Sequence, residues 1–383
     1  MKRVKLLALA GTAGLLTLAV CDLALRVAVN DPVYMMTVTA MPTLFRYNAG
    51  GASDRRIVGD LGSATADTGD DDPRRVAVAI DAFGFRNDSR TARGAIDVVL
   101  LGDSFAFGVG TSQERTLASR LQARSGLAIY NLAMPWTGPW AQYLNLSVES
   151  ERLPLRDGTT VIWLLFSGND LDDAYGELDV QRIPRNGAAG RLLLSLKRFR
   201  NRSPVYRRWR AATNARPDGP ITVVIPSTFV NGRSMLFLKP YADVRRRAYL
   251  EVVTHPNYPA LRQTVAAAAA FVARRNASLK IVLAPSKEEV YAWVLDGAEP
   301  WSASSAPSAL STVLAALCAE SGIPFLDLKT EFVDMSKTIF ERSGDTLWWY
   351  DDSHWNDHGH DLAAAIIHRE LLEGAGIRDG RRP

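Results

Sequence analysis

The chain has 383 residues, of which 47% are hydrophobic and 22% are charged; this composition excludes a disordered protein and provides the core of one large domain or two smaller ones. With 45 Lys and Arg against 41 Asp and Glu the net charge is only +4, which argues against a polycation that binds nucleic acid. The two cysteines, Cys21 and Cys318, exclude a disulfide scaffold and a zinc site of four thiolates.

The N-terminal segment has the pattern of a membrane-targeting sequence. Lys2, Arg3 and Lys5 precede an uncharged apolar run over residues 6–21, which can be extended toward the roughly 20 residues that cross a bilayer. A cleaved signal peptide, a lipoprotein using Cys21 and a buried N-terminal helix are the alternatives. An uncleaved signal anchor over residues 1–28 fits best, since no clean cleavage site is present, and basic residues that stay inside place the rest of the chain outside the cytoplasm.

Residues 29–77 are predicted to be a linker and N-terminal arm. The stretch 49–76 is rich in Gly, Ala, Asp and Ser, which is typical of a flexible loop or linker. A short strand over residues 76–80 and a turn then lead into the main domain, predicted over residues 78–374, with a tail at 375–383.

From Ile96 onward, apolar runs of strand length alternate with helical patterns. Strands are predicted over residues 96–101, 129–132, 161–166, 279–284 and 323–327, and helices over residues 112–126, 139–151, 264–276, 310–321 and 361–372. The alternation predicts an α/β domain with a mostly parallel five-stranded sheet and helices on both faces. In such sheets the ligand binds beyond the carboxyl ends of the strands.

Residues 171–250 interrupt this alternation. They contain many arginines among leucines and aromatic residues. We favour a solvated helical insertion whose apolar residues pack on the core. The alternative is a basic amphipathic segment that touches a membrane surface or an anionic polymer.

Three short motifs follow predicted strands. In residues 102–105 (Gly-Asp-Ser-Phe), Ser104 on a tight turn would expose its hydroxyl at the sheet edge. In residues 167–170 (Ser-Gly-Asn-Asp), Asn169 can donate a hydrogen bond to an oxyanion. Residues 351–360 place carboxylates next to imidazoles, as a general base requires. Each motif alone is also typical of a turn or a helix cap, but together they predict one hydrolytic site.

A metal site is the alternative for the third motif. His354, His358 and His360 are potential ligands, but helical spacing after Gly359 would scatter them and the other two motifs offer no support. We therefore predict neither a metal nor a cofactor.

These motifs resemble those of the SGNH (GDSL-type) hydrolase superfamily, of the membrane-anchored bacterial type, over residues 78–374. The resemblance implies a flavodoxin-like three-layer α/β/α sandwich and metal-free, serine-dependent acyl-ester chemistry. It also implies that Ser104 is the nucleophile and His354 the general base, while Asn169 and the backbone N–H of Ser104 stabilise the oxyanion.

Two positions of the family pattern stay open. The common form would select Asp351 as the partner of His354, whereas the D-x-H-W form, similar to the alginate O-acetyltransferase-like branch, selects Asp352, which we favour. In the segment that supplies a further oxyanion amide, Trp136 stands where the family has glycine and Gly138 lies two residues later, so either could serve.

The resulting hypothesis is a serine-dependent carboxyl-ester hydrolase or O-acyl (acetyl) transferase outside the cytoplasm. Its expected substrate is an acylated carbohydrate of the cell envelope or an exported glycan, or a small ester, and no nucleic-acid partner is predicted. The alternative is an inactive, membrane-tethered carbohydrate-binding or assembly factor, which the unusual Trp136 motivates.

Overall fold

The computed structural model describes residues 14, 17, 20, 21, 37–38, 45–47, 49–64, 73–88, 94–174 and 224–373. Among these residues, none of the helices combines the length and the apolar character that a membrane crossing requires. The predicted anchor over residues 1–28, apart from four positions, the tail at 375–383 and residues 175–223 of the predicted insertion lie outside the described residues.

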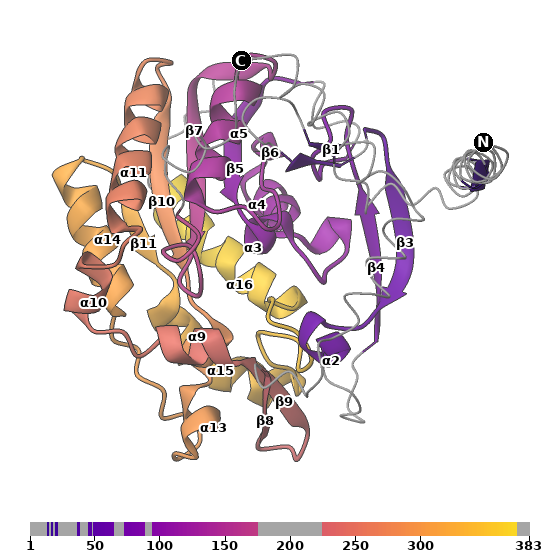
Figure 1. Cartoon of the computed structure of the whole chain (residues 1–383), viewed down its shortest axis with the longest axis vertical. Coiled ribbons are helices and arrows are strands. Elements are labelled where there is room, and N and C mark those ends of the chain that lie inside the picture. Colours follow the sequence, from indigo (N-terminus) through magenta and orange to yellow (C-terminus); the bar gives the residue numbers. More distant parts are fainter. Residues whose placement is uncertain are drawn as a thin grey trace, which may run out of the picture.

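A five-stranded parallel sheet forms the centre of the molecule (Figure 1). Its strands, in the spatial order β11-β10-β7-β5-β6, are β5 (Ile96–Gly102), β6 (Ile129–Asn131), β7 (Leu155–Phe166), β10 (Ser278–Ala284) and β11 (Phe325–Asp327). All neighbouring pairs are parallel. The inner strands are buried nearly throughout, as expected for apolar runs covered on both faces. The predicted sheet is confirmed.

Helices cover both faces of this sheet. Helix α4 (Leu117–Ser125) connects β5 to β6, and α5 (Pro139–Glu149) leads back over β5 to β7, so right-handed crossovers place them on opposite faces. Helix α11 (Tyr258–Ala273) packs beside α5, and α16 (Asp357–Ile367) packs beside α4. Helix α14 (Ala309–Glu320) joins β10 to β11 and completes the predicted alternation.

Several helix boundaries differ from the sequence prediction. The helix predicted over residues 112–126 begins with a 3-10 turn, Gln113–Arg115, and α4 starts after the Thr116 cap. The last helix begins four residues early, because Asn356 caps it, and ends in a π-helical turn, His368–Glu373. Helices α3 (Ser104–Phe107), α12 (Lys287–Val290), α13 (Ala292–Asp296) and α15 (Lys329–Ser343) were not predicted.

The described part of the predicted insertion contains a β-hairpin. Strands β8 (Val224–Thr228) and β9 (Ser234–Leu238) pair antiparallel, followed by α9 (Lys239–Val244) and α10 (Tyr249–Val253). The prediction of a helical insertion is therefore wrong for residues 224–238. The physical reason is the Asn-Gly turn at the tip, where Gly232 adopts φ +82°.

The N-terminal arm is a second departure from the prediction. Strand β3 (Ala52–Ile57) pairs antiparallel with β4 (Arg74–Ala79), and α2 (Asp60–Ala64) follows β3 (Figure 1). Two short strands, β1 (Thr37–Val38) and β2 (Phe45–Arg46), also pair. The loop or linker prediction for residues 49–76 is wrong for residues 52–64, because the backbone of β4 holds β3 and the carbonyl oxygen of Asp351 accepts hydrogen bonds from two amides of α2.

Candidate active site

Ser104 is the first residue of α3, directly after β5. A side chain at Gly102 would place its Cβ 2.7 Å from the Leu164 carbonyl oxygen, so glycine lets the chain turn sharply at this strand end. The Asp103 carboxylate caps α3 by accepting a hydrogen bond from the Phe105 amide at 2.9 Å. The strand-to-helix turn predicted from the sequence is therefore present, and it holds the Ser104 hydroxyl at the carboxyl edge of the sheet.

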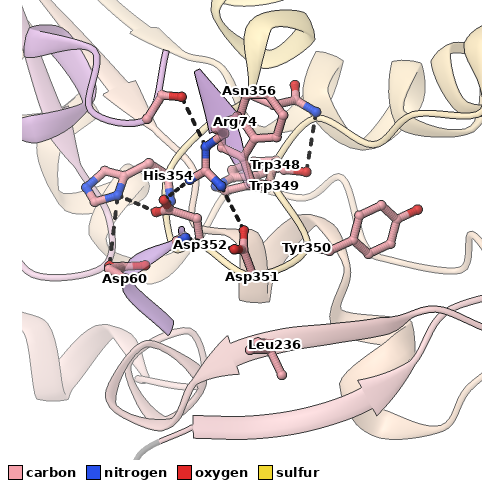
Figure 2. Close-up of polar contacts among 12 residues, drawn as sticks. Asp60, Arg74, Leu236, Trp348, Trp349, Tyr350, Asp351, Asp352, His354 and Asn356 are labelled. Atoms are coloured by element: carbon pink, nitrogen blue, oxygen red, sulfur yellow. Dashed lines mark hydrogen bonds and ion pairs between the residues drawn. The ribbon is translucent and has the colours of Figure 1, made fainter. Parts of the chain in front are cut away.

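His354 is paired with Asp352. The two residues lie on the loop 344–356, which we call the catalytic loop, between α15 and α16. His354 Nδ1 lies 2.7 Å from Asp352 Oδ1, and the His354 amide donates to the same oxygen at 3.0 Å (Figure 2). Asp351 points elsewhere and accepts from the Gly59 amide at 2.7 Å. Of the two predicted alternatives, Asp352 is therefore the partner of the imidazole.

The surroundings of His354 favour its protonated form. Burial lowers the pKa of His354, but the Asp352 carboxylate, followed by Asp60, raises it, and the pKa comes to about 8. Burial would raise the pKa of Asp352, yet His354 and Arg74 together hold it below its usual range. Because the imidazole donates through Nδ1 to Asp352, Nε2 is the atom that can accept a proton.

Ser104 and His354 line one cavity of about 330 Å³. Aromatic packing brings their two segments together: the ring of Phe105 lies 5.3 Å from the imidazole of His354 and 5.1 Å from the indole of Trp355, measured between centroids. Trp355 is completely buried and anchors the catalytic loop beneath α3. The predicted convergence of the first and third motifs is thus present.

Arg74 and Asp60, both in the N-terminal arm, complete the support of the catalytic loop. Arg74 Nη1 donates to Asp351 at 2.9 Å, Nη2 pairs with Asp352, and the guanidinium stacks over the Trp349 ring at 4.4 Å (Figure 2). Asp60 accepts hydrogen bonds from the amide and hydroxyl of Ser353 and lies 3.9 Å from His354 Nδ1. Sequence reasoning missed both residues, since the arm carries no recognisable motif.

Lys287 is a further residue that sequence reasoning missed. It is fully buried, burial lowers its pKa to about 8, and its ammonium donates to four backbone carbonyls, those of Leu236, Trp349, Tyr350 and Asp352. These bonds tie β9 to the catalytic loop. Its position just after β10, at the same sheet edge as the three motifs, was the available signal.

The two candidates for an oxyanion amide lie in different surroundings. Trp136 adopts φ +58°, a left-handed conformation that favours glycine, and its side chain is 78% exposed and lines the cavity. Gly138 begins α5, and a Cβ there would lie 1.9 Å from the Asp173 carbonyl oxygen. Trp136 therefore has the left-handed backbone that a glycine would favour, and it lines the cavity. Gly138, in contrast, is required for close packing against residue 173.

Asn169 follows β7 but does not line the cavity. Its Nδ2 donates to Asp173 Oδ2 at 2.7 Å, and its Oδ1 is buried and has no hydrogen-bond partner within the part of the chain that the structure describes. Asn169 and Gly138 thus both contact Asp173. The role of Asn169 as an oxyanion donor stays a prediction.

The histidines of the third motif do not form a common metal site. His358 lies 3.2 Å from Asp345, and His360 is buried against Trp355, where burial lowers its pKa to about 3. Among the described residues, Asp60, Asp352 and His354 are close enough to share a cation. The Asp352 carboxylate in this group is already engaged by His354 and Arg74, which fits a charge-paired acid–base site.

Solved structures similar to this chain include three at low sequence identity. A lipolytic protein of the G-D-S-L family from Veillonella parvula DSM 2008 is 11% identical, with a TM-score of 0.36 over 73% of this chain and 100% of that chain. Another from Desulfitobacterium hafniense DCB-2 is 12% identical, with a TM-score of 0.34 over 71% and 97%. TesA is 11% identical, with a TM-score of 0.36 over 72% and 97%. None of the curated proteins matches the chain.

The family comparison agrees with the motifs. The model of the GDSL-like Lipase/Acylhydrolase family matches residues 100–362, more than half of the 383-residue chain, and this span contains Ser104, Asn169 and His354. The resemblance to the GDSL-type hydrolases is confirmed, and the family implies esterase or acylhydrolase chemistry. The chain belongs to the GDSL-like lipase/acylhydrolase family.

Proposed function

We propose that this chain is a serine-dependent carboxyl-ester hydrolase. The observation that carries the proposal is the His354–Asp352 pair, joined at 2.7 Å, in the wall of the cavity that also contains Ser104. A buried carboxylate held below its usual pKa fixes the imidazole, and the imidazole offers Nε2 to the nucleophile. This is the arrangement that serine-dependent acyl transfer requires.

The proposed reaction has two halves. Ser104 Oγ attacks the ester carbonyl carbon while its proton passes to His354 Nε2. The backbone N–H groups of Ser104 and Trp136 stabilise the oxyanion, together with the side-chain N–H of Asn169 that is not bonded to Asp173. The C–O bond to the alcohol breaks, the alcohol takes the proton from His354, and an acyl-enzyme remains. Water then attacks this ester, again through His354, and releases the carboxylic acid and free Ser104.

Transfer of the acyl group to a sugar hydroxyl is the second candidate. The exposed indole of Trp136 at the cavity supports it, because a flat apolar ring can pack against a sugar. The D-x-H-W form of residues 352–355 is a second support. Action outside the cytoplasm, on glycans of the cell envelope or exported glycans, is proposed from the basic and apolar pattern of residues 1–28.

A serine-directed probe tests the enzyme proposal. Wild type should be labelled by a fluorophosphonate and should hydrolyse p-nitrophenyl acetate, whereas Ser104→Ala should lose both. Ser321→Ala, which removes an exposed serine hydroxyl that does not line the cavity, is the control and should keep both. Equal turnover by wild type and Ser104→Ala, without labelling, would favour the inactive carbohydrate-binding factor. If mass spectrometry shows that an added oligosaccharide becomes acylated, the result would support acyl transfer in place of hydrolysis.

A further inference from the structure

The wall of the active-site cavity is largely apolar. Beyond Ser104 and His354 it includes Ile57, Val76, Val78 and Phe107. Three charged side chains, those of Arg55, Asp60 and the buried Arg86, also line it. The Arg86 guanidinium is committed to the backbone, since it donates to the carbonyls of Gly108 and Thr111, and the Asp60 carboxylate disfavours an anion. The character of the cavity therefore fits an apolar group rather than an anion.

One wall of this cavity is a face of the N-terminal arm. The strand register pairs Ser53 with Val78 and Arg55 with Val76, and alternate residues of a strand point to the same face. These four side chains line the cavity, whereas Asp54 and its ion-pair partner Arg75 lie on the exposed face. The ribbon of β3 and β4 is therefore amphipathic, with its less polar face turned to the reacting groups.

The opposing wall comes from the nucleophile's own turn. Phe107 and Val109 follow Ser104 within five residues and line the same cavity. The arm lies outside the span of the family match, residues 100–362, so this wall is an addition of this chain to the family domain. An acyl group bound as an ester at Ser104 would extend between Phe107 and the arm.

The size of the cavity indicates the length of that acyl group. A dry apolar cavity of roughly 150 Å³ accommodates a six-carbon ring. The cavity here, at about 330 Å³, is about twice that size, far more than an acetyl group fills. A shorter acyl chain would leave part of the cavity empty. Each methylene group that is missing from the cavity would lower the affinity about fourfold, because less apolar surface is buried.

We propose that the arm and α3 form a binding site for the aliphatic acyl chain of the ester, and that the preferred substrates carry linear chains of about six to ten carbons. This inference rests on the proposed ester hydrolase function and replaces the acetyl group expected from the sequence with a longer one. It leaves the alcohol portion of the substrate, a sugar in the proposal above, outside the cavity.

The test is kcat/KM of the full chain on p-nitrophenyl acetate, butyrate, hexanoate, octanoate and decanoate, each corrected by Ser104→Ala. We expect kcat/KM to rise about fourfold per added methylene up to the length that fills the cavity, and then to level off. Values that are flat or fall from acetate to octanoate, with turnover that requires Ser104, would overturn the acyl-chain site and leave the proposed function intact. Turnover that never depends on Ser104 would overturn both.

A cavity-filling variant tests the location. Val78→Phe should lower the octanoate-to-acetate ratio of kcat/KM at least tenfold. Arg56→Phe introduces the same ring on the exposed face of the ribbon and should leave the ratio unchanged. Because Val78 is buried, its folding is checked by circular dichroism, and Ser53→Leu, half-buried opposite Val78, repeats the test. An unchanged ratio in a folded cavity variant would contradict the proposed location.

Discussion

His354 is the residue whose charge controls the proposed chemistry. As general base it must be neutral, and the carboxylates of Asp352 and Asp60 raise its pKa to about 8. Below that pH the imidazole is protonated and cannot accept the Ser104 proton. We therefore expect kcat/KM to fall about tenfold per pH unit below pH 8 and to level off above it, as a pH–rate profile of the free enzyme would show. A midpoint near pH 6 would contradict the Asp352 pairing.

Asp60 contributes to that midpoint from the arm. Its carboxylate lies 3.9 Å from His354 Nδ1 and is 46% exposed, so its effect is partly screened. Asp60→Asn should shift the midpoint of the pH–rate profile downward by about half a unit to one unit, with little loss of activity at high pH. Asp54→Asn, on the same arm but paired with Arg75 at the surface, is the control and should not shift it.

Trp136 shows what a residue's backbone costs at this site. At φ +58° a residue with a Cβ atom has a strained backbone, whereas glycine adopts this conformation without steric strain. Trp136→Gly should therefore be about 1 kcal/mol more stable than Trp136→Ala, because alanine loses the indole but keeps the strain. Chemical denaturation of the two variants measures this. If the alanine variant is the more stable, residue 136 is not left-handed in solution.

At the scale of elements, the contact between the arm and the catalytic loop is close enough to exclude a methyl group. A Cβ on Gly59 would lie 2.0 Å from the Asp351 carbonyl oxygen, the same oxygen that accepts the amides of Leu61 and Gly62. Gly59→Ala should destabilise the fold by about 1–3 kcal/mol and lower kcat/KM through displacement of Asp351 and of the loop that carries Asp352 and His354. Gly94→Ala, where a Cβ meets nothing within 4 Å, is the matched control. Unchanged kcat/KM in Gly59→Ala would show that the arm does not support the site.

Some of the strands and site residues could be predicted from the sequence, and others could not. The five sheet strands were predicted because short, continuous apolar runs such as residues 161–166 are typical of strands that are covered on both faces of a parallel sheet. Ser104 was found because its motif follows a strand end, and Asp352 and His354 were found because a carboxylate and an imidazole two positions apart can meet on one loop. Strand β3 was missed, since its sequence is polar and half-exposed and its pairing with β4 depends on a contact distant in sequence.

At the scale of the whole molecule, Arg74 links the arm to the catalytic loop across 277 positions of sequence. It is buried between Asp351 and Asp352, so its removal takes the guanidinium away from two buried carboxylates, of which Asp352 keeps the imidazole of His354. Arg74→Met should lower the free energy of unfolding by about 3–5 kcal/mol. The neighbouring Arg75→Met, which breaks the exposed pair with Asp54, should leave it nearly unchanged. Equal stability of the two variants in urea titrations would contradict the structural role of Arg74.

The contacts of Gly59, Asp60 and Arg74 with residues 351–353 have a consequence for biosynthesis. During translation, Ser104 leaves the ribosome well before His354 has been synthesised, so the proposed general base is still missing. The Ser104 hydroxyl of the nascent chain is therefore not activated. Hydrolytic activity should appear only when the loop that carries His354 packs against Gly59, Asp60 and Arg74. Contacts of such long sequence separation also form slowly, so maturation of the catalyst should lag behind completion of the chain.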